Sequence, residues 1–209
     1  MDSYRTVRGA AESRFTEKKS EFIGQVTPCE TWEEALSFVE AARKKYSDAR
    51  HHVSAFINRE GNVQRFDDDG EPKGTGGIPM LEVLKKEELS GVCVVVTRYF
   101  GGILLGAGGL ARAYARGARD AVAAAGICRF VPVYKMEVKI PYPLFSKAEF
   151  ELNARGYRIT GKSFGEDVVL GLLIEEKEKE GLETLLSDLS GGKIAFEIVG
   201  ETYAEEKDA

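Results

Sequence analysis

The chain has 209 residues, of which 43% are hydrophobic and 30% are charged, a composition typical of folded globular proteins rather than fibrous or disordered ones. Its net charge of −5 argues against a protein that coats nucleic acid non-specifically. The sequence contains no apolar run near the roughly 18 residues that span a bilayer and no secretory signal, which predicts a cytoplasmic protein without membrane contact.

The first part of the chain alternates strand and helix patterns. Residues 21–27 are predicted to form a strand. Thr31 then caps a helix, because Glu34 completes a capping box. Alternating side chains predict a strand over 51–58, with 63–66 as its hairpin partner.

The next elements lie on either side of a glycine-rich segment. Helical spacing over 79–89 precedes the valine-rich run 92–97, which is typical of a strand covered on both faces. The glycine-rich stretch 101–109 then leads into a helix predicted over 110–125, which ends at Gly126.

Beyond residue 131 the pattern begins again, which places a domain boundary there and predicts domains 1–130 and 131–209. The order is βαββαβ, the ferredoxin-like arrangement, over residues 133–140, 143–153, 158–164, 168–174, 179–189 and 194–199. The charge is uneven between the two parts. Residues 1–130 contain 19 basic and 18 acidic residues, whereas 131–209 contain 10 and 16. The acidity therefore belongs to the second domain.

The glycine-rich stretch is the first candidate site. It follows a buried strand and opens a helix, so free backbone N–H groups and the positive end of the helix dipole favour an anion there. Arg98 closes the strand, and the helix carries Arg112, Arg116 and Arg119 along one face. Equally, the glycines can serve close packing and the arginines can form a solvated face. The sequence lacks the GK[ST] of a P-loop and a ribose-binding acid, so no nucleotide cofactor is predicted.

The acidic loop 67–77 is the second candidate, because clustered carboxylates can bind a cation or act as acid and base. It lacks the ligand spacing of an EF-hand, so we favour Asp side chains that cap backbone N–H groups and glycines at positive φ, with no metal. His51 and His52 point to opposite faces of a regular strand and cannot bind one ion together. One imidazole can face a site while the other packs in the core.

Three segments, in their order and spacing, resemble the IMPACT/YigZ family: 49–52 (ARHH), 68–75 (DDGEPKGT) and 95–110 (VVTRYFGGILLGAGGL). The resemblance implies an α+β protein. Its first domain is expected to be a ribosomal-protein-like two-layer domain, in which helices pack on one side of a mixed sheet. Its second, ferredoxin-like domain is expected to be similar to one in the translation factor EF-G.

The resemblance also implies a surface groove and a role in translation. The residues carried over are His51, His52, Asp68, Glu71, Thr75, Arg98, Gly101, Gly102 and Arg112, and the glycine stretch adds Gly106, Gly108 and Gly109. Eukaryotic relatives that regulate translation carry a different accessory domain, so their partner is not transferred to this chain.

Three hypotheses follow. The first is a binding module that contacts RNA, the ribosome or a translation-associated protein, with no DNA specificity readable. The second is a small-molecule hydrolase or phosphate-handling enzyme that uses His51 or His52 with Asp68 or Glu71. The third is a protein-interaction regulator without nucleic-acid contact.

Overall fold

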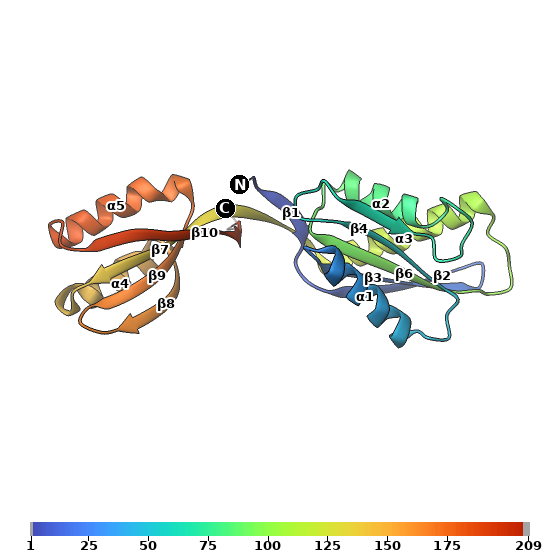
Figure 1. Cartoon of the computed structure of the whole chain (residues 1–209), viewed down its shortest axis with the longest axis horizontal. Helices are drawn as coiled ribbons and strands as arrows, with labels where there is room; N and C mark the ends of the chain where they lie inside the picture. The colour runs from blue at the N-terminus through green and yellow to red at the C-terminus, as the bar shows by residue number, and fades with distance from the viewer. Residues whose placement is uncertain (1, 207–209) are drawn as a thin grey trace. The chain divides into compact units, whose positions relative to one another are not determined.

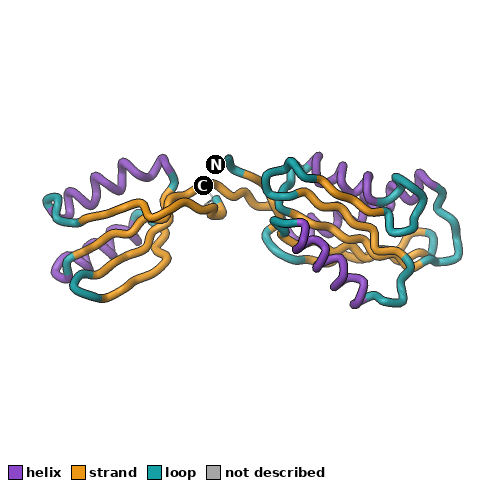
Figure 2. The backbone as a smooth tube through the Cα atoms, in the orientation of Figure 1, coloured by secondary structure: helices purple, strands orange, loops and turns teal. Residues whose placement is uncertain are grey.

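The computed structural model describes residues 2–206. The described chain forms two compact units: one is Tyr4–Arg129, and the other combines residues 2–3 with residues 130–206. The described residues contain five helices and ten strands. The strands lie in two sheets (Figures 1 and 2). The predicted α+β class is confirmed. No helix among residues 2–206 is long and apolar enough to cross a membrane.

The first unit is built on a five-stranded sheet. Its strand order is β2 (Ala11–Glu17), β3 (Ser20–Pro28), β6 (Val92–Tyr99), β4 (His51–Ile57) and β5 (Gln64–Asp67). Every pairing in this sheet is antiparallel, so the expected mixed sheet is corrected. The sequence analysis also missed β1 (Tyr4–Val7) and β2. Buried and exposed positions do not alternate clearly along either strand. Such alternation is the signal that reveals a strand in a sequence.

Helices cover both faces of this sheet, not one as expected from the resemblance. The helices α2 (Gly77–Lys86) and α3 (Ala107–Ala125) share the larger core, whereas α1 (Trp32–Lys45) packs with a smaller core on the opposite face (Figure 1). The reason lies in β6, whose residues are apolar at every position from Val92 to Val96 and therefore bury both faces. The unit has three layers.

Local signals set the helix ends. The predicted capping box of α1 is present, with Thr31 and Glu34 satisfying each other's backbone N–H groups. Gly126 ends α3 at a φ of 72°. Close contact between α3 and β3 depends on Gly24, because a Cβ there would lie 2.3 Å from the carbonyl oxygen of Gly117. The helix can approach the sheet only where that side chain is missing.

The second unit has the predicted βαββαβ order. Its elements are β7 (Ile127–Ile140), α4 (Tyr142–Ala154), β8 (Arg158–Phe164), β9 (Val168–Ile174), α5 (Glu176–Ser190) and β10 (Ala195–Glu205). Strands β10, β7, β9 and β8 lie in that order with antiparallel pairings, as in a ferredoxin-like fold, and β1 also pairs with β7 in this sheet. Its own core lies between the sheet and the two helices. Strand β10 continues six residues past the predicted end at residue 199, because it stays paired with β7 as far as Glu205.

A charged cluster joins β2 to the end of α1. The Glu12 carboxylate accepts hydrogen bonds from Lys45 (2.7 Å), the Tyr46 hydroxyl (2.7 Å) and Arg14 (2.9 Å). Partial burial opposes ionisation, but these three donors outweigh it and lower the pKa of Glu12 to about 2.

We predict that Glu12→Gln destabilises the protein in a pH-dependent way. A lowered folded-state pKa contributes stability above the unfolded value near 4.5, and that contribution is lost as pH falls toward 2. After allowance for the partial exposure of Glu12, the expected loss at pH 7 is about 1–2 kcal/mol. Denaturant unfolding across this pH range measures it. If the free energies of unfolding of wild type and variant differ by the same amount from pH 7 to pH 2, the assignment is wrong.

Candidate functional site

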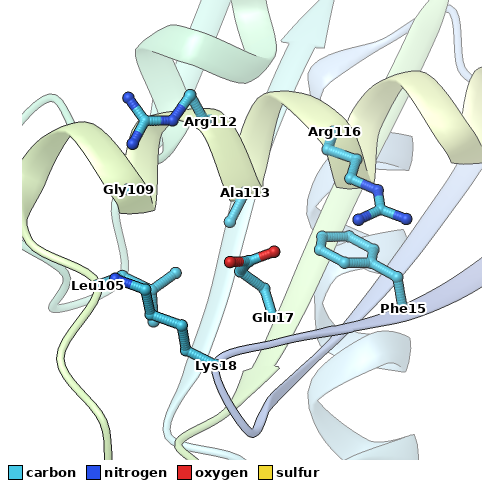
Figure 3. A pocket seen from close by; sticks show the side chains of 8 residues that line it. All are labelled: Phe15, Glu17, Lys18, Leu105, Gly109, Arg112, Ala113 and Arg116. Carbon is cyan, nitrogen blue, oxygen red and sulfur yellow. The ribbon is translucent and has the colours of Figure 1, made fainter.

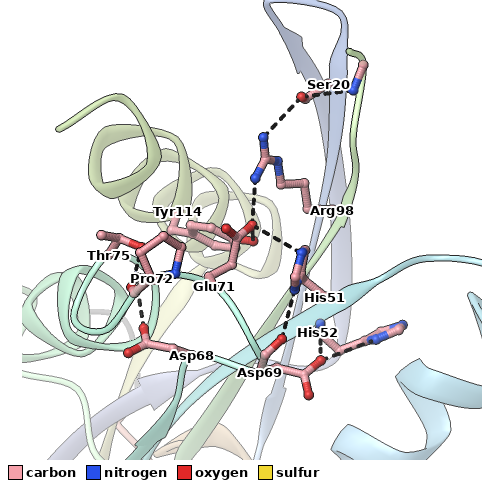
Figure 4. A network of polar contacts seen from close by, with 12 residues as sticks. Ser20, His51, His52, Asp68, Asp69, Glu71, Pro72, Thr75, Arg98 and Tyr114 are labelled. Carbon is pink, nitrogen blue, oxygen red and sulfur yellow. Dashed lines mark hydrogen bonds and ion pairs between the residues drawn. The ribbon is translucent and has the colours of Figure 1, made fainter. Parts of the chain in front are cut away.

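A buried ion pair lies at the centre of the first unit's candidate site. Arg98 donates from a terminal nitrogen to Glu71 Oε1 at 2.7 Å, and both side chains are about 95% buried. The Tyr114 hydroxyl donates to the same oxygen at 2.8 Å (Figure 4). Burial, together with the negative charge of Glu71, raises the pKa of Tyr114, so its hydroxyl remains a donor. Two donors therefore hold the Glu71 carboxylate in one position.

Strand register brings these residues together. Arg98 is the Cα partner of His51 on β4 and of Phe22 on β3, so the three side chains share one face of the sheet. That face is the one that carries Val94 and Val96 into the larger core. Arg98 thus extends an apolar row and needs a buried counter-charge, which Glu71 of the acidic loop supplies.

The two histidines point to opposite faces, as the alternation predicts. His51 Nδ1 lies 2.8 Å from the carbonyl oxygen of Asp69, so Nδ1 carries the hydrogen and Nε2 faces Glu71 Oε1 at 4.0 Å. His52 is 95% buried against α1, where its Nε2 contacts the Tyr46 carbonyl at 3.1 Å. Only His51 therefore belongs to the groove side of the sheet.

The acidic loop is held by its own side chains. Asp68 accepts backbone hydrogen bonds from Gly74, Gly76 and Gly77 at 2.7–3.0 Å. Thr75 donates its hydroxyl to the Pro72 carbonyl at 2.6 Å. Asp68 and Thr75 thus shape the loop, and their polar atoms serve its backbone. No group of three or more His, Cys, Asp or Glu residues with a metal-site arrangement occurs within residues 2–206.

Asp69 also stabilises the acidic loop. It has a φ of 41° and was not singled out from the sequence. Its carboxylate pairs with Arg43 of α1 at 2.8 Å and accepts the His52 backbone N–H at 2.6 Å, while its carbonyl holds His51. A non-glycine residue at positive φ costs free energy, and here the surrounding contacts hold it there.

The glycine stretch serves two purposes. A Cβ on Gly101 would lie 1.9 Å from the Lys19 backbone, so this glycine permits close contact with the turn between β2 and β3. Gly102 and Gly106 have φ of 83° and 71°, and Gly106 precedes α3 as its N-cap. Gly108 and Gly109 lie in the first turn of α3. Together they bring the start of α3 next to the sheet.

These elements enclose a groove of about 270 Å³, which we call the His51 groove. It brings together the predicted residues His51, Glu71, Arg98 and Gly106. Its full lining is Arg50, His51, Glu71, Pro72, Arg98, Phe100, Leu104, Leu105, Gly106, Ala107 and Leu110. The acidic loop and the glycine stretch therefore meet in one groove, whereas His52, Asp68 and Thr75 lie behind it.

Arg112 does not line the His51 groove. It lines a neighbouring cavity of about 230 Å³ between α3 and the turn between β2 and β3 (Figure 3). Gly109 lines this second cavity with it, and Leu105 lines both hollows. The single anion-accepting wall expected from the sequence is thus divided between two adjacent hollows.

Sequence reasoning missed two members of the polar network. Tyr114 falls at an apolar position of α3, and a buried tyrosine needs a partner for its hydroxyl, so that signal was present. Ser20 gave no signal. Its hydroxyl accepts from Arg98 at 3.4 Å and from the Gly101 backbone N–H at 3.2 Å, which ties the glycine stretch to β3.

The fold and groove define a two-unit α+β protein with a polar network beneath a groove in its first unit. Comparison with protein families matches residues 18–122 to the Impact N-terminal domain and residues 138–193 to a domain of unknown function, DUF1949. The chain belongs to the IMPACT family.

Individual relatives agree over most of their length. The chain is 37% identical to the IMPACT family member YvyE of Bacillus subtilis, covering 99% of this chain and 95% of that protein. It is 32% identical to YigZ of Escherichia coli, with coverage of 88% and 92%. A crystal structure of a hypothetical protein is similar at a TM-score of 0.61 and 30% identity, covering 95% of this chain and 98% of the other.

We predict that Glu71→Gln destabilises the protein much more than Tyr114→Phe. Loss of the Glu71 charge leaves Arg98 buried without its counter-ion, which costs about 3–5 kcal/mol. Loss of the Tyr114 hydroxyl leaves the ion pair intact and costs about 1 kcal/mol. Chemical denaturation measures both values. Equal losses for the two variants would mean that the ion pair is not the dominant interaction.

We also predict that Gly101→Ala lowers the free energy of unfolding by about 1–3 kcal/mol, because its methyl group would overlap the Lys19 backbone. Gly9→Ala is the matched control, since a Cβ there meets nothing within 4 Å. Thermal unfolding of both variants tests the close contact. A Gly101→Ala protein as stable as the control would show that this approach is not required.

Proposed function

We propose that the chain is a binding module that acts in translation by contacting single-stranded RNA, on the ribosome or free, through the His51 groove. One observation carries the proposal: Phe100 is 50% exposed at the groove, with the guanidinium of Arg98 5.4 Å from its ring centroid. An exposed aromatic ring beside cations is the usual platform for an unpaired base.

Other features of the groove support binding. Leu104 is 81% exposed at its rim, and Arg50 and His51 line its interior. Leu104 offers apolar contact and Arg50 offers hydrogen-bond donors. The lining carboxylate of Glu71 is held by Arg98 and Tyr114, so it is not free to repel a phosphate. The acidic second domain makes the first domain the favoured place for an anionic partner.

The enzyme alternative finds less support in the same geometry. Asp68 accepts three backbone hydrogen bonds, and His52 faces α1. That leaves His51 beside a Glu71 carboxylate that two donors already engage. Both carboxylates that could act with a histidine are thus already engaged by other donors, so we favour binding.

We further propose that the protein acts in the cytoplasm. Its three cysteines, Cys29, Cys93 and Cys128, are buried thiols, as expected for a reducing compartment. Burial raises the pKa of Cys29 to about 12 and that of Cys93 higher still, so neither thiol ionises at neutral pH.

Equilibrium binding of a short single-stranded RNA to Phe100→Ala tests the proposed function. Stacking of one base contributes about 1–3 kcal/mol, so we expect affinity to fall about tenfold or more. Phe150→Ala is the matched control, because Phe150 is an exposed aromatic on α4 outside the groove. Binding should also weaken steeply with added salt.

Two outcomes would overturn the proposal. If Phe100→Ala and Phe150→Ala bind RNA equally well, the groove is not the binding site. If partners recovered from lysate remain bound after RNase treatment, the protein-interaction hypothesis replaces RNA binding. Turnover of a small-molecule substrate that is lost in His51→Ala would favour the enzyme alternative instead.

A further inference from the structure

The second cavity, the one lined by Arg112, has the chemistry of an anion site. It lies between the first three turns of α3 and the end of β2 with its turn to β3 (Figure 3). Lys18 of the turn and Arg112 and Arg116 of the helix line it, with Glu17 as its acidic member. Three cations face one carboxylate in this lining, and Asp120, which lies outside it, pairs with Arg116, so the local charge is +1.

The start of α3 adds to this positive potential. Its N-cap is Gly106, which offers no side-chain hydrogen bond, and no acidic residue occupies the first turn. The first backbone N–H groups of the helix therefore lack the partners that a cap or an acidic side chain supplies. Gly106 and Ala107 at the start of the helix line the His51 groove, and Gly109 brings the first turn, with its positive dipole end, to the edge of this cavity.

Arg112 is placed against the electrostatic preference of the helix. A Cβ built on Gly108 would lie 3.6 Å from a terminal nitrogen of Arg112, so the guanidinium folds back beside the first turn. A cation at a helix N-terminus is unfavourable, because the dipole there is itself positive. A bound anion removes this conflict, and such local conflicts mark functional positions.

The other two cations are held in place by the fold. Lys18 and Lys19 have φ of 45° and 65°, the paired positive values of a tight hairpin turn. Arg116 lies 4.2 Å from the ring centroid of Phe15, and its Nε pairs with Asp120 at 3.3 Å, which fixes the guanidinium at the cavity wall. Preorganised donors bind an anion with less loss of entropy.

We propose that this cavity binds a phosphate monoester, and, resting on the proposed function, that the monoester is the terminal phosphate of the RNA strand whose base stacks on Phe100. A monoester carries about −1.5 to −2 charges at neutral pH, so Lys18, Arg112 and Arg116 attract it more strongly than they attract the single charge of an internal diester. Leu105 lines both the cavity and the His51 groove, so one strand end can occupy both.

The test compares short single-stranded RNAs of one sequence with a 5′-phosphate, a 3′-phosphate or hydroxyls at both ends. We expect one phosphorylated end to bind wild-type protein about tenfold more tightly than the hydroxyl form, the size of a charge-assisted contact. Arg112→Gln should abolish this difference. Arg119→Gln, on the same helix but outside the lining of both hollows, should retain it.

A second measurement separates failure of this site from failure of RNA binding. Inorganic phosphate should raise the thermal unfolding temperature of wild-type and Arg119→Gln proteins above that in an equal ionic strength of chloride, and should not do so for Arg112→Gln. If phosphate acts in this way but no RNA binds, the site stands and RNA is not its ligand.

The proposal is overturned if the three RNAs bind with equal affinity and phosphate stabilises Arg112→Gln as much as the wild type. Equal RNA binding that still depends on Phe100 would leave the proposed function standing and remove only the phosphate site. An advantage of the phosphorylated end that persists in Arg112→Gln would also place the phosphate elsewhere.

Discussion

The first unit depends on the ion pair between Arg98 and Glu71. Arg98 lies at the end of a strand whose preceding residues are buried valines, so its charge stands where the sheet would otherwise continue its core. Only a carboxylate brought in from another segment makes that position tolerable. The acidic loop provides it, and the loop's turns, caps and positive-φ residues can be understood as the means of carrying Glu71 to Arg98.

Several structural features follow from this requirement. Asp68 closes the loop around backbone N–H groups, and Asp69 anchors it to α1 and β4, so Glu71 arrives in a fixed orientation. Tyr114 of α3 donates to Glu71 and Ser20 of β3 accepts from Arg98, whereas the buried Nε of Arg98 has no hydrogen-bond partner within residues 2–206. The His51 groove follows from this network. Its polar groups hydrogen-bond to one another and form a preorganised floor beneath exposed apolar side chains.

The two hollows divide the chemistry between them. In the His51 groove the buried charges are paired, and the exposed groups are apolar or aromatic apart from Arg50. In the neighbouring cavity the lining cations outnumber the one acidic residue and lie beside the first turns of α3. A ligand with a flat ring and an anionic end would match both surfaces. The two hollows would contribute different interactions to such a ligand: base stacking in the His51 groove and ionic attraction in the neighbouring cavity.

The sequence by itself determined the α+β class, the βαββαβ order of the second unit, the capping box at Thr31 and the opposite orientation of the two histidines. These features depend on local periodicity and neighbouring residues, which a linear sequence records. The tertiary structure alone decided that the sheet is antiparallel with helices on both faces, that Arg98 pairs with Glu71, and that Arg112 belongs to a separate cavity. Each of these depends on which distant segments become neighbours, and burial and charge pairing settle that only when the chain is folded.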